Sequence, residues 1–169
     1  LRGTLVDDYL QLGTDGALIG TDLTAYGFDG DDQIMGSVGN DRLYGGDGQD
    51  RIQGFSGDDQ IWGGFDDDFI YGGEGNDWLF GGEGNDLMRG GEGDDVLIGG
   101  SGLDFLYGGL GNDLLIGGTG TDTASYAGGA KSQYTISAGS SQSIVVRSST
   151  EGTDVLYDVE RIQFTDGTY

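Results

Sequence analysis

The chain contains no cysteine and no histidine. Without cysteine it can form neither a disulfide framework nor a thiolate metal site. Without histidine it lacks the commonest ligand for transition metals and the commonest general base of enzymes. The metal ligands that remain are the hard oxygens of carboxylates and carbonyls, which suit calcium or magnesium.

Basic residues are also scarce. The chain has 7 Lys and Arg against 30 Asp and Glu, which leaves a net charge of −23. Self-repulsion would hold such a chain open unless cations neutralise it. This charge excludes nucleic-acid phosphate and anionic membranes as natural partners and indicates a multivalent cation. No run of residues is long and apolar enough to span a membrane, and no signal peptide opens the chain. Because the chain begins with Leu1, we expect it to be a fragment of a longer protein.

Glycine is abundant, with 38 residues, and a period of nine determines its placement. Eleven units of nine residues run from Gly27 to Ser125, and GGEGNDWLF (72–80) is a typical unit. The first position is always glycine, the fourth is glycine in every unit except at Asp66, and the sixth is always aspartate. The eighth is aliphatic or Met except for Ala124 in the last unit. A fixed period of this kind indicates one structural unit that stacks on itself.

Positions seven to nine of each unit predict a very short strand, and the glycines before them predict a tight turn. Two units make a coil of eighteen residues, and coils stacked about 4.8 Å apart form two parallel sheets. The sequence therefore predicts an all-β fold, a parallel β-roll or β-solenoid with two nonapeptides per coil and its eighth residues in the core. One inner face would carry Ile34, Ile52, Ile70, Met88 and Leu106, and the other Leu43, Ile61, Leu79, Leu97 and Leu115. This core is thin, so burial alone should not hold it.

The repeat divides the chain into three parts. Residues 1–26 are expected to form a degenerate N-terminal coil or cap, in which Gly3–Gln11 fits the nonapeptide with Asp8 and Leu10 at the key positions. Residues 27–125 form the roll. Residues 126–169 leave the period, and strand-like segments at 134–137, 143–147, 155–157 and 159–164 predict a small C-terminal β cap.

Stacking aligns the sixth-position aspartates of alternate units in a column along each side of the roll. Bare carboxylates in such a column would repel one another strongly. A cation between each adjacent pair would turn this repulsion into a cross-link, and carbonyls of the glycine turns would complete an oxygen shell that favours calcium over magnesium. The fifth-position acids and amides, such as Asp58 and Asn76, are expected to brace their own turns instead. The expected metal ligands are Asp32, Asp41, Asp50, Asp59, Asp68, Asp77, Asp86, Asp95, Asp104, Asp113 and Asp122.

The tandem pattern GGxGxDxUx resembles the RTX, or haemolysin-type calcium-binding, repeats of secreted bacterial proteins. The segments TASYAGGAKSQYTIS and DVLYDVERIQFTDGTY are similar to segments that follow such repeats. The resemblance implies calcium ions between adjacent turns, one turn giving the carbonyls of its first and third residues and the other those of its second and fourth. One implied site combines Gly45, Asp47 and Asp50 with Gly64, Asp66 and Asp68. Another combines Gly54, Ser56 and Asp59 with Gly73, Gly75 and Asp77. The stack would hold roughly nine calcium ions.

The expected function follows from coupled metal binding and folding. The chain would be a non-catalytic, calcium-binding module of a secreted, extracellular protein, disordered without calcium and folded with it. The resemblance implies the type I secretion apparatus as a partner during export. No singular constellation of reactive side chains indicates an enzyme, whereas the parent protein could be one.

An alternative function rests on outward-facing aromatic residues at the seventh and ninth positions. Tyr44, Trp62, Trp78 and Phe80 make an outer face too apolar for ordinary protein surface. One possibility is that this face is covered, either by the terminal segments or by a second copy of the chain through self-association. The second possibility is that the face forms a platform for polysaccharide. The second possibility makes the chain a polysaccharide-binding or adhesion module, such as the accessory module of a polysaccharide-modifying enzyme.

Overall fold

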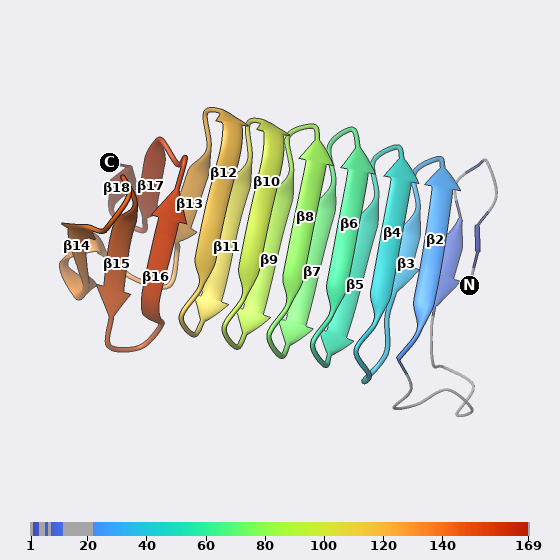
Figure 1. Cartoon of the computed structure of the whole chain (residues 1–169), viewed down its shortest axis with the longest axis horizontal. Coiled ribbons are helices and arrows are strands. Elements are labelled where there is room, and N and C mark those ends of the chain that lie inside the picture. The colour runs from blue at the N-terminus through green and yellow to red at the C-terminus, as the bar shows by residue number, and fades with distance from the viewer. Residues whose placement is uncertain (1, 4–5, 7, 12–21, 169) are drawn as a thin grey trace.

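The computed structural model describes residues 2–3, 6, 8–11 and 22–168, which form two nine-stranded β-sheets packed face to face. Figure 1 shows the coils side by side along the long axis, with the C-terminal cap at the end opposite the N-terminus. Sheet I contains, in spatial order, β1 (Tyr9–Gln11), β3 (Gln33–Met35), β5 (Arg51–Ser56), β7 (Phe69–Glu74), β9 (Leu87–Glu92), β11 (Phe105–Leu110), β13 (Thr123–Tyr126), β17 (Arg161–Phe164) and β18 (Gly167–Thr168). Sheet II contains β14 (Tyr134–Ala138), β15 (Ile144–Ser148), β16 (Gly152–Tyr157), β12 (Leu114–Gly120), β10 (Val96–Gly102), β8 (Trp78–Glu83), β6 (Gln60–Phe65), β4 (Arg42–Asp47) and β2 (Thr24–Asp29).

The strands of the roll pair in parallel with a register of eighteen residues. In sheet II, Leu79 lies opposite Leu97, and in sheet I, Ile70 lies opposite Met88. The eighth-position residues from Ile34 to Leu115 are all 0% exposed, and they form one continuous core between the sheets. The predicted parallel β-roll with two nonapeptides per coil is confirmed.

The strands are longer than the three residues predicted from the repeat. A typical strand, β8, has six residues, because it continues from positions seven to nine into the first three residues of the next unit. Its pairing with β10 resumes at Gly82 opposite Gly100 and Glu83 opposite Ser101. The glycine turns therefore belong to the sheets, and the loops between strands contain only a few residues around each sixth-position aspartate.

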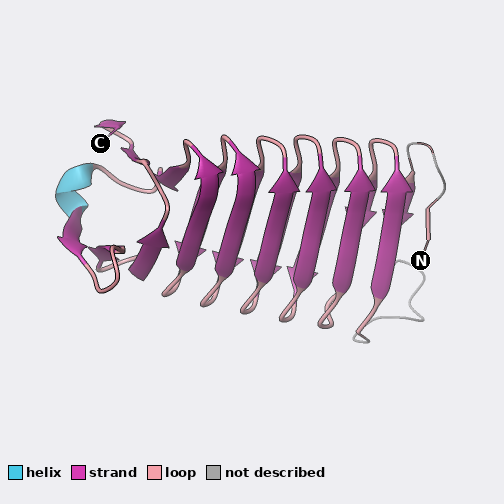
Figure 2. Cartoon of the chain, turned by 45° about the horizontal axis from the view of Figure 1, so that its top comes forward, coloured by secondary structure: helices cyan, strands magenta, loops and turns pink. Residues whose placement is uncertain are grey.

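The C-terminal cap continues both sheets. β16 pairs in parallel with β12, and β17 pairs in parallel with β13. β14, β15 and β16 are antiparallel neighbours, and a short 3₁₀ helix (η1, Lys131–Gln133) precedes them, as Figure 2 shows. Tyr126, Tyr134 and Phe164 pack their rings together beneath this end of the core.

The N-terminal coil is described only in part. Leu10 is buried, and β1 pairs in parallel with β3, with Leu10 opposite Ile34. Residues 12–21 of the predicted degenerate coil lie outside the described residues. No helix in the described part of the chain is long and apolar enough to cross a membrane.

Candidate metal centre

The sixth-position aspartates form two buried columns, one along each edge of the roll. Each of these aspartates immediately precedes a strand or its first paired residue, so the sheet register places it directly above its counterpart in the next coil. Their side chains are at most 3% exposed: Asp32, Asp41, Asp50, Asp59, Asp68, Asp77, Asp86, Asp95, Asp104, Asp113 and Asp122. The structure thus places all eleven predicted ligands in the two columns.

One carboxylate oxygen of each aspartate faces the preceding coil. Asp77 Oδ1 accepts the main-chain N–H of Asp59 at 2.8 Å, and Asp95 Oδ1 accepts that of Asp77 at 2.8 Å. The same bond joins successive aspartates of the other column, for example Asp50 N–H to Asp68 Oδ1 at 2.8 Å. These hydrogen bonds fix the orientation of each carboxylate through Oδ1 and do not involve its second oxygen, Oδ2.

The second oxygen, Oδ2, faces the following coil. A Cβ added to Gly72 would collide with Asp77 Oδ2 and would lie 2.9 Å from Gly90 O, so both oxygens lie in the gap between these two units. Within the described chain, nine of these buried Oδ2 atoms accept no hydrogen bond: those of Asp50, Asp59, Asp68, Asp77, Asp86, Asp95, Asp104, Asp113 and Asp122. A buried carboxylate oxygen without a donor is costly, so nine of them, divided between the two columns, call for bound cations.

Asp41 differs from the other aspartates in its column. The main-chain N–H of Ser37 donates to Asp41 Oδ2 at 2.6 Å, and the Ser37 hydroxyl lies 3.3 Å from Oδ1. Ser37 occupies the second position, where most units have glycine. In the gap that follows Asp41, the carboxylate oxygen Oδ2 therefore already accepts a hydrogen bond, unlike the Oδ2 atoms of the nine aspartates above.

Main-chain carbonyls line the same gaps, and those of successive turn residues face opposite coils. The second and fourth positions have positive φ in every unit except the one that begins at Gly36, as at Gly46 (131°) and Gly48 (124°). The Gly46 carbonyl lies against Gly64 in the following coil. First-position carbonyls face the preceding coil instead, since Gly63 O lies against Gly45. Third-position carbonyls do the same, because Gly57 N–H donates to Glu74 O at 2.8 Å.

The predicted grouping of carbonyls is therefore inverted in the structure. Gly45 O and Asp47 O face the preceding coil, whereas Gly64 O and Asp66 O face the following one. The set predicted for the other edge fails for the same reason, because Gly54 O faces the preceding coil and the carbonyls of Gly73 and Gly75 face the following coil. That set comprised Gly54, Ser56, Gly73 and Gly75.

The arrangement can hold a cation only by combining side chains with main chain. In the described residues no three acidic side chains surround one point. The gap after Asp50 instead combines Asp50 Oδ2 and Asp68 Oδ1 with carbonyls of the second and fourth positions of one unit and the first and third positions of the next. Carboxylate and carbonyl oxygens in such numbers are the ligands that calcium prefers.

Burial raises the pKa of the aspartates from Asp50 onward in the two columns, and their main-chain hydrogen bonds offset only part of this effect. The pKa rises from 3.8 to about 8 at Asp59, Asp68 and Asp95, to about 7 at Asp50 and Asp113, and to about 6 at Asp77, Asp86 and Asp104. At neutral pH the carboxyls with a pKa of about 7 or 8 thus hold a proton part of the time, and a divalent cation can replace those protons.

The fifth-position residues have a different role from the one predicted. Asn40 Oδ1 accepts the main-chain N–H of Asp58 at 3.0 Å, and Asp58 Oδ1 accepts that of Asn76 at 2.8 Å. These side chains tie each coil to the next one rather than bracing their own turns. They add an exposed hydrogen-bond ladder beside each aspartate column.

The aromatic residues predicted as a platform stack on one another along sheet II. The rings of Tyr44 and Trp62 are 4.5 Å apart and nearly parallel, at 5°, and those of Trp62 and Phe80 are 5.3 Å apart at 4°. Their faces thus pack against one another within the ladder, and the three rings are half-buried. Trp78 is different, because it is 51% exposed and tilted by 36° against Phe80.

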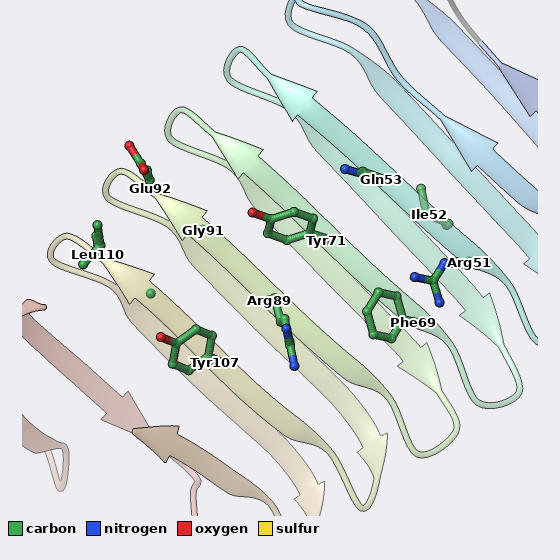
Figure 3. A pocket seen from close by; sticks show the side chains of 11 residues that line it. Arg51, Ile52, Gln53, Phe69, Tyr71, Arg89, Gly91, Glu92, Tyr107 and Leu110 are labelled. Carbon is green, nitrogen blue, oxygen red and sulfur yellow. The ribbon is translucent and has the colours of Figure 1, made fainter. Parts of the chain in front are cut away.

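The opposite outer face, on sheet I, carries a groove of about 450 Å³ along its own row of outward side chains. Figure 3 shows Arg51, Phe69, Tyr71, Arg89 and Tyr107 along it. The Arg51 guanidinium lies 4.5 Å from the centre of the Phe69 ring, and Arg89 lies in register between Tyr71 and Tyr107. Two of the three arginines in this very acidic repeat, Arg51 and Arg89, lie along this groove.

Taken together, stacked coils with carboxylate and carbonyl oxygens between them define a metal-binding parallel β-roll. The family model of the RTX calcium-binding nonapeptide repeat matches residues 26–54, 53–88 and 89–124. This match covers more than half of the chain, which therefore belongs to the family of RTX calcium-binding repeats. A search of curated proteins finds no match.

Proposed function

We propose that this chain is a calcium-binding module that folds when calcium fills the gaps between its coils. The observation that carries the proposal is the column of buried Oδ2 atoms that accept no hydrogen bond and face converging carbonyls. Each gap between successive aspartates of one column would bind one ion. Eleven aspartates in two columns then give roughly nine calcium ions.

Each proposed site uses both coils that border it. In the gap between the units of Gly45 and Gly63, the ligands are Asp50 Oδ2 and Asp68 Oδ1 with the carbonyls of Gly46, Gly48, Gly63 and Phe65. Six protein oxygens satisfy the lower end of calcium's usual coordination number, and water can add to them. Every interior aspartate then serves two ions, which makes neighbouring sites depend on each other.

Calcium dependence of folding follows from the electrostatics of the columns. The net charge is −23, and the core is a single row of aliphatic residues from each sheet. Without cations, burying two columns of ionised carboxylates opposes folding by repulsion and desolvation. Roughly nine dications offset about eighteen charges and convert repulsion into cross-links.

This behaviour suits a module of a secreted protein that acts outside the cell. A chain that remains unfolded where calcium is scarce can pass through a narrow type I secretion apparatus, and it folds where calcium is abundant. The module itself is structural and non-catalytic, and any activity belongs to the parent protein.

The test is a titration of far-ultraviolet circular dichroism with calcium, after treatment with a chelator. We expect a weak strand signal in chelator, a cooperative rise with calcium and a much smaller effect of equal magnesium. A full strand signal in chelator, or equal rescue by magnesium, contradicts the proposal.

A second candidate function is binding of an acidic polysaccharide, and the groove on sheet I favours it. Arg51 and Arg89 place two guanidinium groups beside aromatic rings, a combination that suits carboxylated sugars, although Glu92 adds one negative charge to the lining. Oligouronates should bind more tightly than neutral oligosaccharides, and Arg89→Ala should weaken this binding, whereas Arg147→Ala, in the cap, should not. Equal binding of charged and neutral glycans, or none, contradicts this second candidate.

A further inference from the structure

The C-terminal cap contains the segment EGTDVLY (151–157), which lies where a further nonapeptide would lie. β16 pairs in parallel with β12, and Leu115 lies opposite Leu156. Asp154 therefore takes the sixth position of an additional unit. It is 41 residues beyond Asp113, whereas neighbours within the repeats are 18 residues apart. The hairpin of β14 and β15 lies in this interval, so the periodicity is lost in the sequence but continues in space.

The hydrogen bonds around Asp154 reproduce those of the repeats. Asp113 N–H donates to Asp154 Oδ1 at 3.0 Å, and Gly111 N–H donates to Glu151 O at 2.9 Å. The Gly111 carbonyl lies against Gly152, whose φ of 98° has the positive sign found at the fourth position of the repeats. The third, fourth and sixth positions of the additional unit are thus occupied by residues with the repeat geometry.

The same gap contains a buried oxygen without a donor. Asp113 Oδ2 accepts no hydrogen bond from the described residues, and it is aimed along the same direction as the other Oδ2 atoms of its column. The Asp154 side chain that closes the gap is only 3% exposed. Asp113 Oδ2, Asp154 Oδ1, Gly111 O and Glu151 O therefore border one gap, and water can complete a calcium shell around them.

The other column ends in a similar way, with glutamate instead of aspartate. Asp122 N–H donates to Glu160 Oε2 at 2.8 Å, so Glu160 occupies the sixth position of the following coil. The Asp158 carbonyl lies against Gly117, where the first-position carbonyl of a repeat would lie. Asp122 Oδ2 is buried and accepts no hydrogen bond from the described residues. Because Glu160 is exposed, this second gap is more open than the first.

We propose that the cap binds two further calcium ions, one between Asp113 and Asp154 and the other between Asp122 and Glu160. The inference rests on the proposed function for the identity of the metal, and it extends binding beyond the matched repeats, which end at residue 124. Calcium would then tie the cap to the last coil, so that cap and roll fold as one unit.

Native mass spectrometry at saturating calcium tests this inference by counting bound ions. Asp154→Asn and Glu160→Gln keep an oxygen that can accept the main-chain N–H but remove a charge. Each variant should lose one ion, and the double variant should lose two. Asp166→Asn is the matched control: it removes the same charge from an exposed side chain of the cap outside both gaps, and asparagine keeps an oxygen that can accept the Lys131 N–H. This control should keep the full count.

The outcomes separate the two proposals. A double variant that has the wild-type strand signal and the wild-type ion count overturns the cap sites and leaves the roll sites intact. Where the double variant fails to fold, anomalous scattering from calcium in crystals of the unaltered chain decides the question. A peak between Gly111 and Gly152 supports the inference. An empty gap there beside filled repeat gaps overturns it, and empty gaps throughout overturn the proposed function as well.

Discussion

Replacing Asp77 tests whether one carboxylate serves two calcium ions. The side chain is 0% exposed, and its Oδ1 accepts the Asp59 N–H at 2.8 Å on the side of the preceding coil. Its Oδ2 lies over Gly72 in the gap that faces the following coil. Asp77→Ala therefore removes one ligand from each of two neighbouring sites. If each aspartate belonged to one site only, the variant would lose a single ion.

The expected magnitude follows from the number of ions lost. An ion present at 100 times its dissociation constant contributes about 2.7 kcal/mol to the free energy of unfolding, so the loss of two ions costs about 5 kcal/mol. Asp77→Ala also leaves the buried Asp59 N–H without an acceptor, which costs about 1–3 kcal/mol. Asp77→Asn keeps an acceptor for that N–H and should show only the part that depends on calcium.

The assay combines ion counting with urea denaturation at fixed free calcium. Both Asp77 variants should lose two ions, and Asp77→Ala should be the less stable of the two. Glu83→Gln removes the same charge from an exposed third-position side chain, so it should keep the full count. A loss of one ion or none by a folded Asp77→Asn variant refutes the shared-ligand geometry.

Three further predictions concern acidity, backbone strain and the aromatic ladder. Burial raises the pKa of Asp59 and Asp95 from 3.8 to about 8, so in chelator the folded state gains stability as pH falls from about 8, and the gain is complete below 3.8; a strand signal that declines over this range contradicts the argument. Phe55 has a φ of 84°, which strains a residue with a side chain, so Phe55→Gly should stabilise the roll by about 1 kcal/mol in thermal denaturation. Phe65 has no positive φ, so Phe65→Gly should destabilise the roll by about 0.5–1 kcal/mol, the usual cost of glycine within a strand. Trp62→Leu should cost about 1–3 kcal/mol through its two ring stacks, and mass spectrometry should show an unchanged calcium count.

The sequence predicted the features that depend on side-chain type and period. Aspartate at every sixth position and an aliphatic residue at the eighth require opposite environments, and a register of eighteen residues is the simplest way to align both. The structure accordingly buries the eighth-position residues between the sheets and the aspartates along their edges. Only the identity of the residue and its place in the period were needed for this result.

Features that depend on main-chain direction could not be predicted in the same way. Whether a carbonyl faces the preceding or the following coil depends on the orientation of its peptide plane, and Gly45 and Gly46 differ in this respect although the sequence shows the same residue twice. The role of Asp58 was missed because its partner, Asn76, is one coil away rather than in its own turn. Asp154 was missed because a hairpin interrupts the period in the sequence without interrupting it in space.

The register also limits how the chain can change in length. Strands bond to partners eighteen residues away, so removing one whole coil leaves every remaining strand in its own sheet. Removing nine residues would instead transfer all later strands to the opposite sheet. The outward row that contains Trp62 would then continue into the row that contains Tyr71, and β16 would no longer lie in the same sheet as the early strands β2 and β4. Insertions and deletions in a gene for this chain should therefore be tolerated in steps of eighteen codons, and half-steps should be selected against.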